Sequence, residues 1–391
     1  MTSMFDSTLV DTADHHPLLR ESVRKLVARY GRSYFQGVVS RKEKPVELWA
    51  ELGAAGYLGV HISEQYGGGG GGLADYSVVV EETAAQGCPL MSLVLGSICP
   101  PIIEQHGTDE MKQKWLPGIA KGTLRLAFSV TEPDAGTNTH RVTTTAHKDG
   151  NGWRLSGTKY FSSAVDESDA IVVVARGDTA DASGRHPLSL FVLPADAPGI
   201  TMHPIETVIQ APEKQFTLFF EDVPLGQETL LGQEGEGLRH VFAGLNPERV
   251  CAASMSNGIA RFALKKGAQY ASERVVWKTL IGAHQGIAHP LAKAYIAVQQ
   301  ARLMTARAAQ LYDAGSPDAA EAANMAKFAA ADASLEALDQ ALQTHGGNGF
   351  ALEYGLADLW FIARLNKTAP VSREMILNFI AQHSLGLPKS Y

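Results

Sequence analysis

Two changes of hydrophobic pattern limit the fold of this chain more than any other feature of its sequence. Leu18 to Ala120 reads as short helices that glycine and proline separate. The clearest of these helices are Pro45 to Leu52, Ala74 to Gln86 and Asp109 to Ala120. Strand-like runs follow, and helical signals return after Gly237. Strands and helices do not alternate, as a doubly wound parallel sheet would require, so the order favours an α+β fold.

The middle region has short apolar runs rich in β-branched and aromatic residues, which are typical of strands. These runs are Leu124 to Val130, Ile171 to Ala175, Leu188 to Leu193 and Phe216 to Phe220. Between the strand-like stretches Val142 to Ala146 and Trp153 to Leu155 stands Asp149-Gly150-Asn151-Gly152. Glycine tolerates the positive φ of a tight turn, so this segment predicts a hairpin and the region predicts an antiparallel β domain.

Two long helices are expected near the C-terminus. Asp318 to His345 contains neither glycine nor proline and consists mainly of alanine, leucine and charged helix formers. At 1.5 Å per residue, such a helix would be about 42 Å long. Leu291 to Ala314 also lacks helix breakers, and Leu291, Tyr295 and Val298 form one apolar face. Paired long helices predict a helical bundle.

Composition excludes several classes of protein. The 391 residues are 45% hydrophobic, enough for two or three domains with cores, and the net charge is −7 without long runs of one sign. A general nucleic-acid or anionic-membrane surface is therefore not expected. Without an apolar stretch of membrane length or a leader-like N-terminus, we expect a cytoplasmic protein with no membrane partner. Cys88, Cys99 and Cys251 form no CxxC pair, so neither a disulfide framework nor a metal site is predicted.

The glycine run Gly67 to Gly72 formally satisfies the dinucleotide-binding pattern G-x-G-x-x-G. Six consecutive glycines satisfy any glycine pattern, however, and no βαβ unit follows. A turn between two helices is the simpler interpretation.

Five stretches, in order, resemble the acyl-CoA dehydrogenase family over about residues 15 to 385. The first is Ser63-Glu64-Gln65-Tyr66-Gly67-Gly68, followed by Glu81-Glu82. The second is Phe128-Ser129-Val130-Thr131-Glu132-Pro133-Asp134-Ala135-Gly136-Thr137-Asn138, similar to the family's strand-to-loop signature beside the flavin. The resemblance implies that five residues of this loop contact FAD: Phe128, Val130, Thr131, Gly136 and Thr137. It also places Thr137 near the substrate. The alternative is that the loop merely ends a strand.

The third stretch, Gly157-Thr158-Lys159-Tyr160-Phe161-Ser162-Ser163, resembles the family segment G-x-K-x-W-I-T. The resemblance implies that Phe161 replaces a tryptophan packed on the isoalloxazine ring and that Ser163 replaces a threonine near flavin N5. Ordinary aromatic packing in a β core is the alternative for Phe161.

The fourth stretch combines Pro247-Glu248-Arg249-Val250, then Tyr270 to Trp277, and His284-Gln285. It is similar to the family's E-R helix, its Y-A-x-x-R-x-x-F-G segment and the glutamine that follows. By this resemblance Arg274, Trp277 and Gln285 contact FAD, and Arg274 binds its pyrophosphate, a task suited to a forked, permanently charged donor. A surface ion pair is the alternative for Arg274. Trp277 replaces phenylalanine and Lys278 replaces glycine.

The fifth stretch, Gln343-Thr344-His345-Gly346-Gly347-Asn348-Gly349-Phe350, resembles the family's Q-x-x-G-G-x-G-[FY]. It implies that Gln343, Gly346 and Gly347 contact FAD of a neighbouring subunit, and hence a homotetramer or a dimer. Glycines also commonly end helices, which is the structural alternative.

The catalytic base is the main departure from the family. Members of the family remove the acyl α-proton with a glutamate, and the commonest position, in E-G-T, falls on Pro370, with Ser372 in place of the threonine as a cofactor contact. Proline has neither a carboxylate nor an N–H. A second pattern, in isovaleryl- and long-chain-type members, places the base before the E-R arginine, which makes Glu248 the candidate. Glu248 could instead pair with Arg249, with Glu374 or another carboxylate as the base. Arg249 is expected near substrate, orienting or neutralising carboxylates.

The resemblance implies an acyl-CoA dehydrogenase-like α+β fold with three domains. These are an N-terminal α-helical domain (1–122), a middle antiparallel β-barrel domain (123–236) and a C-terminal four-helix bundle (237–391). It implies FAD-dependent α,β-dehydrogenation of an acyl-CoA in fatty acid metabolism, with electrons passed to an electron-transfer flavoprotein. A flavin oxidase or oxygenase and a noncatalytic subunit are the alternatives. The acyl group is not predicted, because Leu90, Met91, Leu95 and Ile98 could line a pocket or be core.

Overall fold

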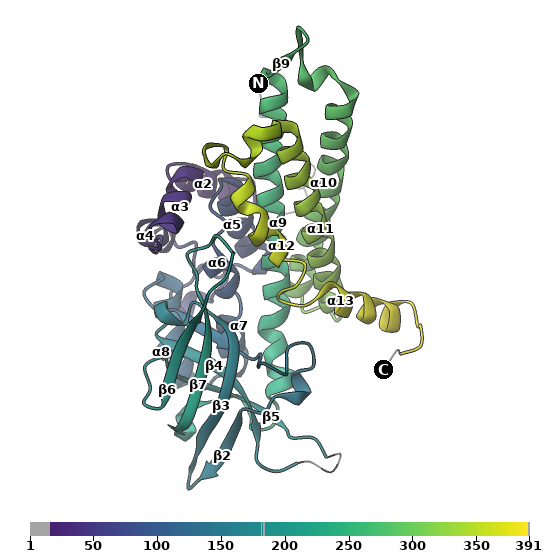
Figure 1. Ribbon diagram of the computed structural model, residues 1–391. Helices are drawn as coiled ribbons and strands as arrows, with labels where there is room; N and C mark the ends of the chain where they lie inside the picture. The colour runs from purple at the N-terminus through teal and green to yellow at the C-terminus, as the bar shows by residue number, and fades with distance from the viewer. Residues whose placement is uncertain (1–15, 181, 183, 390–391) are drawn as a thin grey trace.

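The computed structural model describes residues 16–180, 182 and 184–389. Figure 1 shows a helical N-terminal region and a β-sheet beside a bundle of long helices, which confirms the predicted α+β fold and its order of regions. The prediction that the extreme N-terminus is no leader falls on residues 1–15, outside the described residues. Within the described residues no helix is both long and apolar enough to cross a membrane.

Seven helices of the N-terminal region are described: α2 (Pro17–Val27), α3 (Gly31–Ser40), α4 (Val46–Ala54), α5 (Leu73–Ala85), α6 (Met91–Leu95), α7 (Cys99–His106) and α8 (Asp109–Lys121). The bounds of α8 follow from local chemistry. The Thr108 hydroxyl accepts a hydrogen bond from the Met111 N–H at its start, and Gly122 ends the helix with φ of +74°. The three helices predicted in this region are confirmed to within two residues.

The glycine run is a tight loop before α5. A Cβ on Gly68 would lie 2.1 Å from the carbonyl oxygen of Ile62, so this position accepts only glycine. Asp313 accepts hydrogen bonds from the N–H groups of Leu73 and Ala74 at 2.7 and 2.9 Å, which caps the start of α5. In the described part of the chain no strand precedes the loop, so the turn interpretation is confirmed.

The sheet has the strand order β6-β7-β3-β2-β4-β5-β8, with β1 also paired to β4. Its strands are β1 (Leu126–Ser129), β2 (Thr145–Asp149), β3 (Gly152–Ser163), β4 (Ala170–Gly177), β5 (Leu188–Pro194), β6 (Ile200–Ile205), β7 (Gln215–Leu225) and β8 (Leu230–Leu231). The predicted hairpin is confirmed, because Asp149 pairs with Gly152 and Gly150 has φ of +57°.

Two details of the sheet differ from the predicted antiparallel barrel. β4 pairs in parallel with both β1 and β2, so the sheet is mixed. The chain reverses between β2 and β3 and again before β4, so β4 runs in the direction of β2 and pairs beside it rather than beside β3. Among the described strands, β6 and β8 are the two ends of the hydrogen-bonded path, so the ladder is open.

The bundle contains α9 (Gly237–Glu273), α10 (Gln285–Asp313) and α11 (Ala319–His345), followed by the shorter α12 (Trp360–Leu365) and α13 (Arg373–Phe379). In the described C-terminal residues these are three long helices rather than the predicted four, and α5 of the N-terminal region also packs along α9 and α10. Buried alanines at a spacing of mostly four residues let α11 approach its neighbours closely: Ala322, Ala326, Ala330, Ala333, Ala337 and Ala341.

One end of the bundle carries a short hairpin, β9 (Val275–Val276) and β10 (Thr279–Leu280), which joins α9 to α10 (Figure 1). Helix α10 begins six residues earlier than predicted and includes Pro290. The carbonyl that proline leaves without a partner belongs to Gly286 in the exposed first turn, where water can bind it.

Three hydrophobic clusters hold the regions together. One joins the N-terminal helices to the bundle, a second joins α7 and α8 to β1, β4 and α9, and a third lies on the other face of the sheet. Helix α9 therefore runs through the junction of all three regions. Cys88, Cys99 and Cys251 are buried free thiols, as expected.

Candidate functional site

Glu248 lies on α9 at this junction and is partly buried. Its carboxylate has no hydrogen-bond partner among the described residues. Burial raises the pKa of Glu248 to about 7, although the positive charges of Arg249 and Lys327 act in the opposite direction. The negative charge of Glu248 also contributes to the raised pKa values of the Cys99 and Cys251 thiols. The carboxylate is therefore partly buried, within electrostatic reach of α7 and α11, and more basic than an ordinary glutamate.

Arg249 does not form a direct ion pair with Glu248 within the described residues. Its Nη1 donates a hydrogen bond to Asn246 Oδ1 at 3.0 Å, and its guanidinium lies 5.9 Å from the centre of the Phe242 ring. Burial lowers the pKa of Arg249, and Glu248 partly offsets this shift. Among the described residues, the direct partnership that was the structural alternative is therefore absent, and Arg249 acts on Glu248 only through its charge.

The loop of Pro370 approaches the same place from the C-terminal side. The Nζ of Lys327, on α11, donates a hydrogen bond to the Val371 carbonyl at 2.5 Å. Ser372 caps α13, since its hydroxyl accepts a hydrogen bond from the Met375 N–H at 3.3 Å. Lys327 thus fixes the residue after Pro370 to α11, and its positive charge also acts on Glu248. Sequence reasoning missed Lys327, and its only signal was a lysine within an alanine-rich helix.

The turn after β1 is fixed against β3. The Tyr160 N–H donates to the Thr131 carbonyl at 2.8 Å, and the Thr131 hydroxyl donates to the Tyr160 carbonyl. Glu132 accepts hydrogen bonds from the N–H groups of Thr143 and Thr144 at 2.7 and 2.9 Å, and from Lys159 Nζ at 2.9 Å. The Lys159 side chain is fully buried. The backbone of the predicted cofactor loop is therefore held before any ligand binds.

The residues predicted to pack on the flavin come from the irregular end of β3. The register with β7 shifts between Lys159 and Ser162, and Phe161 in this interval has φ of +57°. Phe161 is 52% exposed, so it does not belong to the sheet core. The Ser163 hydroxyl donates to Gln215 Oε1 at 2.8 Å. Along the preceding loop, Phe128, Val130 and Thr131 are partly buried, whereas Gly136 and Thr137 are exposed.

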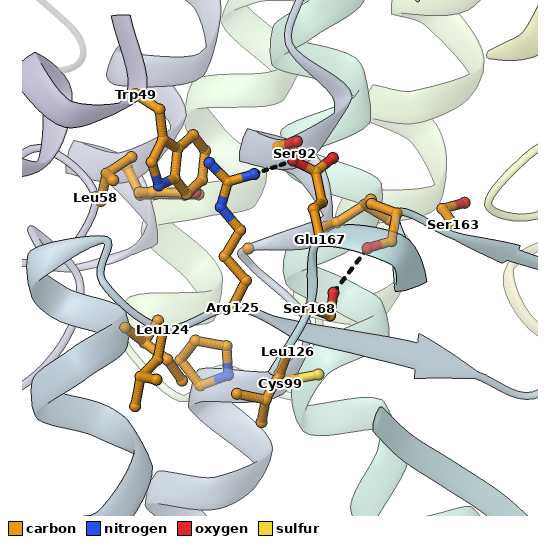
Figure 2. Close-up of a pocket in the computed structure, with 16 residues that line it drawn as sticks. Trp49, Leu58, Ser92, Cys99, Leu124, Arg125, Leu126, Ser163, Glu167 and Ser168 are labelled. Carbon is orange, nitrogen blue, oxygen red and sulfur yellow. Dashed lines mark hydrogen bonds and ion pairs between the residues drawn. The ribbon is translucent and has the colours of Figure 1, made fainter. Parts of the chain in front are cut away.

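A cavity lies between the N-terminal helices and the sheet (Figure 2). Ser163 lines one side, and Cys99, whose thiol pKa responds to Glu248, lines another. The Arg125 guanidinium stacks 4.0 Å from the Trp49 ring centre and pairs with Glu167 at the cavity wall. The sequence left open whether Leu90, Met91, Leu95 and Ile98 line a pocket or belong to the core. Of these four, only Leu95 lines this cavity. Leu90, Met91 and Ile98 are core residues.

The remaining predicted cofactor residues lie elsewhere. Arg274, Trp277 and Gln285 are exposed where α9 and α10 meet, and Gln343, Gly346 and Gly347 are exposed where α11 ends. Both groups are at the end of the bundle that carries the β9–β10 hairpin, away from the sheet (Figure 1). Within a single chain, these residues therefore lie apart from Thr131 and Ser163, which belong to the sheet region. No cluster of metal-ligand residues occurs within the described ranges.

Comparisons with known proteins agree with this architecture. Residues 13–123, 127–223 and 235–385 match the N-terminal, middle and C-terminal domains of acyl-CoA dehydrogenase. The chain is 50% identical to acyl-CoA dehydrogenase fadE12 of Mycobacterium bovis over 99% of this chain and all of that protein. It is 30% identical to the rat long-chain specific acyl-CoA dehydrogenase, over 95% and 86% of the two chains.

A solved structure gives the same result. Butyryl-CoA dehydrogenase of Megasphaera elsdenii superposes with a TM-score of 0.87 at 28% identity, covering 94% of this chain and 98% of that one. The agreement extends over all three regions of the fold. This chain therefore belongs to the acyl-CoA dehydrogenase family of oxidoreductases.

Proposed function

We propose that the protein catalyses FAD-dependent α,β-dehydrogenation of an acyl-CoA thioester, with Glu248 as the base. The observation that carries this proposal is a partly buried carboxylate that has no hydrogen-bond partner among the described residues and a pKa raised to about 7. The relatives named as acyl-CoA dehydrogenases support the reaction class.

The described residues fit FAD in two places. At the sheet, the half-exposed Phe161 ring lies beside the turn after β1. Hydrogen bonds of Glu132 and Tyr160 hold the backbone of this turn in place. At the bundle end, Arg274 presents an exposed guanidinium suited to a pyrophosphate. We assign the loop from Phe128 to Thr137, together with Phe161 and Ser163, to the flavin. When bound, FAD supplies the hydride acceptor for the reaction.

Glu248 takes the proton from the acyl α-carbon in this proposal. An ordinary glutamate is too weak a base, and burial increases the proton affinity of Glu248. Arg249 and Lys327 limit this increase, so a substantial fraction of Glu248 remains ionised near pH 7. Pro370 contributes no carboxylate, and Glu374 is exposed on α13.

We further infer that a complete FAD site needs two chains, because Arg274, Gln343 and Gly347 lie at the opposite end of the bundle from Thr131. A homotetramer is proposed, and a dimer would satisfy the same contacts. An electron-transfer flavoprotein as electron acceptor, a cytoplasmic location and a role in fatty acid metabolism are parts of the same proposal.

The test is anaerobic mixing of the purified protein with a panel of acyl-CoAs while flavin absorbance is recorded. Wild-type protein should bleach with at least one acyl-CoA, and Glu248→Gln should keep its flavin without bleaching. Glu374→Gln, a change at an exposed carboxylate, is the matched control and should bleach normally. Bleaching by Glu248→Gln at the wild-type rate would exclude Glu248, and a colourless protein that cannot be reconstituted would favour a noncatalytic subunit. Rapid oxygen consumption would favour an oxidase.

A further inference from the structure

Ser163 and Gln215 form a side-chain pair where two strands of the sheet meet. Ser163 ends β3 and Gln215 begins β7, and the two residues are directly opposite each other in the antiparallel pairing. Side chains at opposite positions of paired strands lie on the same face of the sheet. The Ser163 hydroxyl donates a hydrogen bond to Gln215 Oε1 at 2.8 Å. Ser163 also lines the cavity shown in Figure 2, so the pair lies at a cavity wall.

The surroundings of Gln215 hold its amide in place. Gln215 is only 9% exposed, so water does not readily replace its partner. The carbonyl of the preceding Lys214 accepts a hydrogen bond from the Ala164 N–H at 2.8 Å. Glu213 accepts hydrogen bonds from the N–H and the hydroxyl of Ser92 at 2.7 and 2.8 Å. The start of β7 is therefore tied both to the end of β3 and to α6.

The bond to Gln215 determines what the Ser163 hydroxyl offers to a ligand. A serine hydroxyl has one proton to donate and two lone pairs with which to accept. In the part of the chain that the structure describes, the proton of Ser163 is committed to Gln215. Toward a ligand, the hydroxyl therefore acts as an acceptor. It stabilises a ligand atom that carries a hydrogen, and it does not stabilise one that presents a lone pair.

The two redox states of a flavin differ in this respect. The oxidised ring has a lone pair at N5, whereas the ring that has received a hydride carries an N5–H. In the proposed reaction the β C–H bond breaks, and its hydrogen leaves with both electrons to the flavin. The α C–H bond also breaks, its proton goes to Glu248, and its electron pair becomes the new C=C bond. An acceptor beside N5 therefore favours the reduced flavin.

We propose that Gln215 is a positioning residue that raises the reduction potential of the bound flavin, because it holds the Ser163 proton and leaves the hydroxyl as an acceptor for N5–H. The inference rests on the proposed function, in which Ser163 lies at the flavin, and it adds the direction of the hydrogen bond there. Gln215 acts only through Ser163.

The experiment measures the midpoint potential of the flavin-loaded protein against a reference dye, without substrate. Gln215→Leu frees the Ser163 proton for the oxidised flavin, so the preference for the reduced state should fall about tenfold. For a two-electron couple this change lowers the potential by about 30 mV. In a Ser163→Ala background, Gln215→Leu should leave the potential unchanged. An unshifted potential in the single variant, or an equal shift in both backgrounds, would overturn the inference.

Ser168→Ala is the matched control. The Ser168 hydroxyl lines the same cavity and donates to the Ala164 carbonyl at 2.8 Å, but it is not assigned to the flavin. Its removal should therefore leave the potential in place. A drop equal to that of Gln215→Leu would show that any change at this cavity wall alters the potential, and would contradict a specific role of Gln215.

A second measurement does not depend on the folding of a Gln215 variant. Flavin labelled with ¹⁵N at N5 would be followed by NMR in wild-type protein and in Ser163→Ala. The N5 signal of the oxidised flavin should be nearly the same in both proteins, and that of the reduced flavin should differ. A difference confined to the oxidised state would show that Ser163 donates to N5, which is the reverse of the inference.

The failure of the proposed function has its own signature. A protein that takes up no flavin would refute that function and this inference with it. A wild-type protein that binds flavin and is bleached by an acyl-CoA, together with an unshifted potential in Gln215→Leu, would refute only the role of Gln215.

Discussion

The hydroxyl of Tyr312 donates a hydrogen bond to the backbone carbonyl of Ala243 at 2.7 Å. Ala243 is four residues before Pro247, which has no N–H to complete the helical bond to that carbonyl. The Tyr312 hydroxyl, on α10, thus replaces the donor that Pro247 lacks. Pro247 is the residue directly before Glu248 on α9. This relationship explains how a proline is tolerated within the helix that carries the candidate base.

Tyr312→Phe should lower the free energy of unfolding by about 1–2 kcal/mol, because the Ala243 carbonyl loses the hydroxyl that replaces the missing N–H in a partly buried place. Urea unfolding would measure the loss. Tyr34→Phe, which removes a hydrogen bond to the exposed Glu47, is the control and should cost less. In a Pro247→Ala background, which restores the N–H, Tyr312→Phe should cost less than in wild type. An equal cost in both backgrounds would separate Tyr312 from the proline.

Glu248 should make the stability of the protein depend on pH. Its pKa in the folded state is about 7, above the ordinary value of 4.5, so the unfolded chain releases this proton more readily. Stability from this group is complete below about pH 4.5 and is lost as pH rises toward 7 and above. Glu248→Gln should therefore be more stable than wild type at pH 8, by about 1–2 kcal/mol after allowance for solvent screening.

Thermal or urea unfolding of the two proteins at pH 5 and pH 8 would measure this difference, using conditions of about equal ionic strength. Exposed Glu374→Gln should show no comparable gain. If Glu248→Gln were equally destabilised at both pH values, the carboxylate would not carry the expected ionisation cost.

Lys159→Met should destabilise the middle region strongly. Lys159 and Glu132 form a nearly fully buried ion pair at 2.9 Å, and removal of one partner leaves a buried charge uncompensated. The expected loss is about 3 kcal/mol, together with weaker flavin retention, because Glu132 also holds the backbone of Thr143 and Thr144. Adding Glu132→Gln to Lys159→Met should recover part of the stability, and the exposed Lys148→Met is a control at a surface pair. No recovery in the double variant would mean that packing dominates.

The long helices and most strands could be predicted from the sequence because their patterns are local. Asp318 to His345 lacks helix breakers and forms α11, and the Asp149 to Gly152 turn forms the hairpin. The parallel pairing of β4 could not be predicted, because the choice between β2 and β3 as its neighbour depends on contacts far apart in the sequence. The start of α10 was placed too late because the predicted segment was chosen to be free of helix breakers, whereas the helix includes the partly buried Pro290.

The assignment of the site residues rests on family resemblance and stays a prediction. The partly buried position of Glu248 and the 52% exposure of Phe161 are compatible with it. Neither Lys327 nor Tyr312 could be found from spacing, since each acts on a segment distant in the sequence: Lys327 on Val371 and Tyr312 on Ala243. Such partnerships become visible only when the helices are packed.

Mixed oligomers should reveal whether Arg274 serves the site of another chain. Arg274→Met has an intact Glu248, and Glu248→Gln has an intact Arg274, so each variant alone lacks one component of every site. If the flavin region and Arg274 come from different chains, a mixed dimer contains one site with both components and one with neither. Co-expressed chains with distinct tags should therefore regain bleaching, at up to about half of the wild-type amplitude per mixed dimer.

Co-expression of Arg274→Met with the double variant Arg274→Met/Glu248→Gln is the control, since no combination of these chains completes a site. Absence of recovery in flavin-containing mixed oligomers would mean that Arg274 and Glu248 serve a site within one chain, whereas bleaching by the control oligomers would restore the interpretation of Arg274 as a surface residue.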